Sequence, residues 1–180
     1  MSGTSLVCVG LNESDAMPPD AQALVDTGLF EAFFRVPAPS GRRDRYWCSV
    51  VEGLPDDADI ALVITADAGV TPEILRLGKL MDDWIAVALP LSLQHNIARP
   101  LIKPQEEISL SSADLNHWLN RYAVGKPLEV PLIAGFCGWV SAKALREIDA
   151  LDDFALAEGL RRRGYSILLS DEAFVDDSAN

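Results

Sequence analysis

The chain has 180 residues, 49% of them hydrophobic, which is enough for a real core, and we expect residues 1–180 to form a single domain. Its 27 acidic and 15 basic residues give a formal net charge of −12, which disfavours binding to nucleic acid or to anionic lipid headgroups. No apolar run reaches the ~20 residues of a membrane-spanning helix, and no signal-peptide pattern opens the chain, so a cytoplasmic protein is expected. The cysteines show no C-x-x-C spacing and are expected to be buried, reduced thiols; they are Cys8, Cys48 and Cys137.

Strands and helices are predicted to alternate along the chain. Short apolar runs predict strands at residues 6–9, 60–64, 84–89, 130–140 and 165–169. Helical spacing behind capping residues predicts helices at 46–54, 71–81, 111–122, after Ser141, and at 152–163. Residues 20–34 are ambiguous, and residues 90–108 are expected to form a long irregular segment. The alternation predicts an α/β domain with a mainly parallel sheet, in which ligands bind beyond the carboxyl ends of the strands.

One acidic residue follows a predicted buried strand directly. Asp67 comes after the apolar run 60–64, where a carboxylate can hold a hard divalent cation that bridges two phosphates. An aspartate in this position is also a common turn former. Asp67 is therefore a candidate metal ligand.

Three segments of the chain together resemble a known family. The segment GRRDRYWCSVVEGLPDDADIALVITADAGVTPEIL resembles family-2-type glycosyltransferases, especially relatives of chitin and hyaluronan synthases. The segment IAGFCGWVSAKALREID resembles the acceptor-side strand and helix of that family, and LDDFALAEGLRRRGYSILLSDEAFV resembles its acidic helix ending in Gly-Tyr. The resemblance covers about 140 residues and implies a single GT-A-type domain of nucleotide-diphospho-sugar transferases.

The resemblance implies a role for several residues on the donor side. Asp67 matches the second acid of the metal-binding DxD motif, with Mn²⁺ or Mg²⁺ as the cofactor. Arg42 and Arg43 match the loop that faces the nucleotide, and Asn12 follows the first strand on the same donor-binding side. These residues would offset the charge that develops on the departing nucleoside diphosphate.

On the acceptor side, the resemblance implies that Asp153 is the catalytic base and that Asp152 is its acidic neighbour. Asp153 would take the proton from the acceptor hydroxyl as it attacks the anomeric carbon. A bland alternative for Asp153 is the N-cap of the predicted helix, and an arginine-rich loop such as 42–45 can be merely solvated.

The chain also departs from the family pattern. Thr65 stands in place of the first acid of the DxD motif, so weaker metal binding is expected, and Phe154 follows the acidic pair where the pattern has arginine. Asp176 and Asp177 replace a histidine after the last strand, which makes Asp177 a second candidate metal ligand. Residues 29–36 are the candidate for the second strand, but no aspartate pair follows them to hold a nucleoside.

The favoured hypothesis is a soluble glycosyltransferase that moves one sugar from a nucleotide-sugar donor to a glycan, lipid-linked or small-molecule acceptor. The chain lacks the Gln-x-x-Arg-Trp motif and membrane helices of processive synthases, so polymer extrusion is not expected. One alternative is a catalytically degenerate relative that acts as a binding module. Another is a nucleotidyltransferase, although VGLNESD carries one glycine where such enzymes have a glycine-rich loop.

Overall fold

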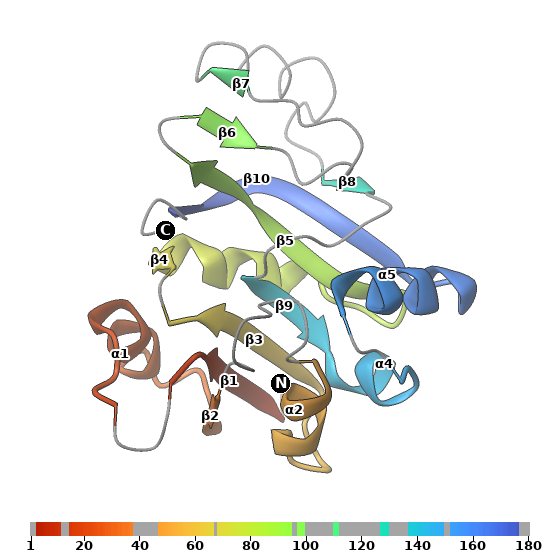
Figure 1. Cartoon of the computed structure of the whole chain (residues 1–180), viewed down its shortest axis with the longest axis horizontal. Helices are drawn as coiled ribbons and strands as arrows, with labels where there is room; N and C mark the ends of the chain where they lie inside the picture. Colours follow the sequence, from red (N-terminus) through yellow and green to blue (C-terminus); the bar gives the residue numbers. More distant parts are fainter. Residues whose placement is uncertain are drawn as a thin grey trace.

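The computed structural model describes residues 3–11, 15–37, 47–66, 68–94, 97–99, 110–111, 127–129, 137–149 and 152–176. Figure 1 shows a central sheet with helices around it. Within these ranges, no helix has both the length and the apolar character that a membrane crossing requires. Residues 112–122 of the expected helix and residues 130–136 of the expected strand lie outside the described ranges.

The described strands form one sheet in the order β2-β1-β3-β9-β5-β10-β4, with β6, β7 and β8 paired beside this path. Their bounds are β1 Thr4–Val9, β2 Ala32–Val36, β3 Ile60–Thr65, β4 Gly69–Val70, β5 Ile85–Gln94, β6 Ile97–Arg99, β7 Leu110–Ser111, β8 Leu128–Glu129, β9 Gly138–Ser141 and β10 Ser166–Asp176.

The five longest of these strands run in the same direction. β1 pairs in parallel with β2 and β3, and β5 pairs in parallel with β10. β9 is antiparallel to both β3 and β5, which makes β3 and β5 parallel to each other. The sheet is therefore mainly parallel, as predicted, and the carboxyl ends of β1, β2, β3, β5 and β10 lie along one edge.

Helices cover both faces of the sheet. Their bounds are α1 Pro19–Val25, α2 Trp47–Gly53, η1 Pro72–Leu80, α4 Ala142–Arg146 and α5 Asp153–Arg162. α2, α4 and α5 bury Val50, Leu145 and Leu156 in the apolar cluster on one face. α1 and η1 bury Leu24 and Ile74 in the cluster on the other face. Burial on both faces explains why β3 is a continuous apolar run rather than an alternating pattern.

The segment expected to be a helix over 71–81 is a 3₁₀ helix, η1. Its apolar residues Ile74, Leu77 and Leu80 recur every three positions, which matches the three residues per turn of a 3₁₀ helix. Ile74 and Leu77 are fully buried, so this spacing turns one edge of η1 to the sheet. The ambiguous stretch 20–34 contributes all of α1 except its first residue, and the start of β2.

The expectation of an irregular segment over 90–108 is wrong at its start, because β5 continues through Pro90 to Gln94 and β6 follows at Ile97. On one side β5 pairs with β9 only as far as Ala88, and with β6 only from Ser92. On this side of β5, Pro90 therefore lies between the last residue paired with β9 and the first residue paired with β6. A proline is tolerated there because the N–H that it lacks is not needed for a hydrogen bond between strands. The final strand is also longer than predicted and extends to Asp176.

Candidate functional site

The carboxyl ends of β1, β2 and β3 are tied together by backbone hydrogen bonds. Gly10 N–H donates to the carbonyl of Val36 at 2.8 Å, and Ala66 N–H donates to the carbonyl of Val9 at 2.8 Å. Gly10 has φ +94°, a conformation that side-chain-bearing residues rarely adopt. The chain segments that leave these three strands therefore start from one compact edge of the sheet.

The last strand reaches the same edge from the other side of the sheet. Asp176 of β10 pairs with Gly69 of β4, and Val175 pairs with Val70, in antiparallel register. The N–H of Val70 also donates to Asp20 Oδ2 of α1 at 3.2 Å. The segment after β3 and the end of β10 are thus neighbours.

Thr65, at the position of the first acid of the DxD motif, contacts a buried thiol. Its backbone N–H donates to Cys137 Sγ at 3.4 Å, and its hydroxyl lies 3.8 Å from the same sulfur. Cys137 directly precedes β9 and is 6% exposed. Cys8 is buried as expected, whereas Cys48 is only partly buried, and none of the three cysteines forms a disulfide.

Asp153 is held by a tryptophan from a distant part of the chain. The indole Nε1–H of Trp47 donates to Asp153 Oδ1 at 2.6 Å, across 106 positions of sequence. Trp47 opens α2 and lies four positions after Arg43 in the sequence. The candidate base is therefore in contact with a residue that lies close in sequence to the candidate donor loop.

Asp152, rather than Asp153, is the N-cap of α5. Its Oδ1 accepts the backbone N–H of Ala155 at 2.8 Å, and Asp153 is the first helical residue. The expectation that capping would account for Asp153 is therefore wrong by one residue. The predicted end of the helix is confirmed, since Gly164 follows its basic last turn with φ +85°.

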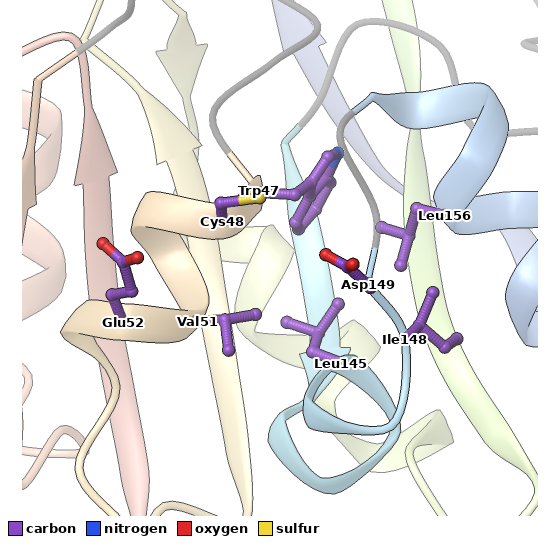
Figure 2. Close-up of a pocket in the computed structure, with 8 residues that line it drawn as sticks. All are labelled: Trp47, Cys48, Val51, Glu52, Leu145, Ile148, Asp149 and Leu156. Carbon is purple, nitrogen blue, oxygen red and sulfur yellow. The ribbon is translucent and has the colours of Figure 1, made fainter.

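A cavity of about 190 Å³ lies between α2 and the segment from α4 to α5. Figure 2 shows the indole of Trp47 at the upper end of this cavity, with Leu145 and Ile148 below. The carboxyl group of Asp149 lies between them in this view, and that of Glu52 lies at the left margin. The cavity thus shares Trp47 with the Asp153 hydrogen bond. A larger hollow of about 380 Å³, lined in part by Asp59 and Ser141, lies at the amino ends of the parallel strands.

The remaining candidates from the sequence fall outside the described residues; they are Asn12, Arg42, Arg43, Asp67 and Asp177. Within the described ranges, no three His, Cys, Asp or Glu side chains gather closely enough to hold a metal ion. The sequence analysis missed two residues at the site, Trp47 and Cys137. Nothing in the spacing along the chain indicates either contact, because each joins residues far apart in the sequence.

Comparisons with known proteins address the fold. No family model matches the sequence, and no curated protein matches it by sequence. The solved structure of GalNAc-T7 with UDP, GalNAc and Mn²⁺ matches 97% of this chain with a TM-score of 0.58 and 11% sequence identity. The match covers 42% of the GalNAc-T7 chain, so this protein spans less than half of that length. The α/β architecture predicted from the sequence is therefore confirmed as a GT-A-like glycosyltransferase fold.

Proposed function

We propose that the protein is a glycosyltransferase that moves one sugar from a nucleotide-sugar donor to a glycan, lipid-linked or small-molecule acceptor. The observation that carries the proposal is the Trp47–Asp153 hydrogen bond within a GT-A-like fold, because it joins the candidate base to a residue four positions after Arg43 of the candidate donor loop. The similarity to chitin and hyaluronan synthase relatives stays a prediction from the sequence, as do the single domain and the cytoplasmic location.

On the donor side, Asp67 and Asp177 are proposed to hold Mn²⁺ or Mg²⁺. Carboxylate oxygens are the ligands that these hard cations prefer. The pairing of Gly69 with Asp176 supports the assignment, since each of these residues lies within two positions of a proposed ligand. A bound cation supplies positive charge against the diphosphate leaving group. Arg42 and Arg43 would add hydrogen bonds to the diphosphate, with Asn12 beside the nucleotide.

On the acceptor side, Asp153 is proposed to act as the general base. Its carboxylate takes the proton of the acceptor hydroxyl while the oxygen attacks the anomeric carbon, and the bond from that carbon to the nucleoside diphosphate breaks. Asp152 keeps the first turn of α5 in place through its bond to Ala155. Asp152 is therefore proposed to hold Asp153 in position.

Thr65 favours a second candidate function. A threonine beside the Cys137 thiol brings no negative charge to the metal, which is compatible with a binding module that has lost turnover. In that case the chain would bind a glycan, a nucleotide or a protein without releasing a nucleoside diphosphate.

The test is Asp153→Asn in an assay of nucleoside diphosphate release. UDP-glucose, UDP-N-acetylglucosamine, UDP-N-acetylgalactosamine and GDP-mannose, each with Mn²⁺ and a panel of methyl glycosides, serve as probes. Asparagine keeps an oxygen that accepts from Trp47 but cannot take a proton, so kcat should fall by roughly 10²- to 10⁴-fold. Asp56→Asn, at an exposed acid in the turn between α2 and β3, is the matched control and should leave the rate unchanged. No release with any donor would favour the binding module.

A further inference from the structure

We infer that Trp47 is a positioning residue, which orients the carboxylate of Asp153 through its indole N–H. The inference rests on the proposed function, because it assigns Trp47 a task in the transfer reaction. Its basis is the 2.6 Å bond from Trp47 Nε1 to Asp153 Oδ1. A tryptophan side chain has this one donor group, and here the donor meets a carboxylate.

The position of Trp47 is fixed by packing. Its side chain is 1% exposed and belongs to the apolar cluster that also contains Val50, Leu145 and Leu156. Figure 2 shows the indole nitrogen turned away from Leu145 and Val51 at the upper end of the cavity. Buried rings rarely change rotamer without a cost in packing, so the indole N–H has a defined direction. The Asp153 carboxylate, which accepts the hydrogen bond from this N–H, is oriented by it.

The neighbouring carboxylates of Asp152 and Asp153 have different hydrogen-bond partners. Asp152 accepts the backbone N–H of Ala155 and stabilises the start of α5. Asp153, one residue later, accepts a hydrogen bond from the Trp47 side chain of α2. This bond adds nothing to the backbone hydrogen bonds of α5. A charge-assisted bond to a fixed donor limits the rotation of a carboxylate, and catalytic groups need orientation within narrow limits. The Trp47–Asp153 bond thus supplies the fixed orientation that a catalytic base requires.

A purely structural role, in which the bond only pins α2 to α5, predicts a different outcome from a positioning role. Trp139 offers a matched control on the other face of the sheet. It is also buried, and its Nε1–H donates to the backbone carbonyl of Ile74 at 2.8 Å. Trp→Phe at either position removes one indole donor and leaves a ring in the core. The two variants should lose similar stability, and only one of them loses the contact with Asp153.

The kinetic experiment compares Trp47→Phe and Trp139→Phe in the full chain, with the donor that gives the fastest release in the assay above. Misplacement of a catalytic group by about 1 Å costs on the order of 10²-fold in rate. We expect Trp47→Phe to lower kcat by about 10- to 100-fold with little change in the KM of the donor, whereas Trp139→Phe stays within about twofold. Equal kcat values for the two variants at a temperature where both are folded would overturn the positioning role.

A spectroscopic readout tests the bond without turnover. The chain has four tryptophans, so a ¹⁵N–¹H spectrum contains four indole N–H resonances, and Trp47→Phe identifies the one from Trp47. Asp153→Asn replaces the charged acceptor with a neutral one and should move this resonance upfield, with smaller changes in the other three. An unmoved Trp47 resonance overturns the inference whatever the activity. A moved resonance together with full activity of Asp153→Asn instead overturns Asp153 as the base, and with it the proposed mechanism.

Discussion

Asp176 pairs with Gly69 in the antiparallel register of β10 and β4. The last described residue of the chain therefore lies beside the segment that follows β3, although more than half of the sequence separates the two. In the sequence, Asp67 comes two positions before Gly69, and Asp177 comes directly after Asp176. This arrangement gives the metal proposal a specific prediction.

Asp67→Asn and Asp177→Asn should each weaken Mn²⁺ binding, because an amide oxygen lacks the charge that a hard cation prefers. We expect at least a 10-fold rise in the Mn²⁺ concentration needed for half-maximal nucleoside diphosphate release. Asp26→Asn is the control, since Asp26 bonds only locally with Gln22 in what the structure describes, and asparagine keeps that acceptor. A Mn²⁺ requirement equal to that of the unaltered chain in both variants would remove these two residues from the metal site.

Arg42→Ala and Arg43→Ala should weaken binding of the donor diphosphate. A hydrogen bond to a charged group contributes about 1.5–3 kcal/mol, so each substitution should raise the Kd of UDP or GDP by roughly 10-fold or more. Arg161→Ala, in the exposed last turn of α5, changes the net charge equally and serves as the control. Isothermal titration measures the Kd of the nucleotide for each of the three variants. Equal Kd values in all three would mean that Arg42 and Arg43 do not contact the diphosphate.

Asp152→Ala should destabilise the fold, because it removes the side chain that caps α5. Loss of an N-cap costs about 1 kcal/mol, which lowers the Tm of a chain of this size by about 2–4 °C. Asp152→Asn keeps a capping oxygen and should retain both the Tm and the transfer rate. A low rate in Asp152→Asn at unchanged Tm would show that the charge of Asp152 takes part in the reaction.

Glu73 gives a prediction for pH dependence. The side-chain hydrogen bond from Thr71, followed by a backbone hydrogen bond, lowers the pKa of the Glu73 carboxyl below its ordinary value. A lowered pKa in the folded state contributes stability above the ordinary pKa, and this contribution is lost as the pH falls through the folded pKa. Thr71→Val should therefore raise the pKa of Glu73 toward its ordinary value in an NMR titration, while Thr71→Ser should preserve it. An unchanged pKa in Thr71→Val would assign the shift to the backbone.

Much of the fold could be predicted from local patterns. The apolar run of β3 and the acidic start and basic end of α5 each specify their element within a few residues. Strand direction could not be predicted, because an apolar run such as β9 has the same pattern in either direction, and β9 is antiparallel to both of its neighbours. The path of β5 through Pro90 depends on which strands flank it, which is a property of the assembled sheet.

The candidate site was less predictable than the fold. Asp153 could be singled out from the resemblance, but its contact with Trp47 depends on how α2 and α5 pack on the same face. The contact between Thr65 and Cys137 likewise exists only because β9 lies beside β3. By contrast, the capping role of Asp152 was open to prediction, since a capping residue precedes the first helical residue, and the sequence analysis misplaced it by one position.

Isothermal titration of UDP, GDP and their sugars, with and without Mn²⁺, tests most directly whether the carboxyl edge of this sheet binds a nucleotide-sugar donor through Asp67. We predict saturable binding of at least one nucleotide that requires Mn²⁺ and that weakens by 10-fold or more in Asp67→Asn. The absence of heat with every nucleotide in the presence of Mn²⁺, or equal affinity in Asp67→Asn, would contradict the proposal.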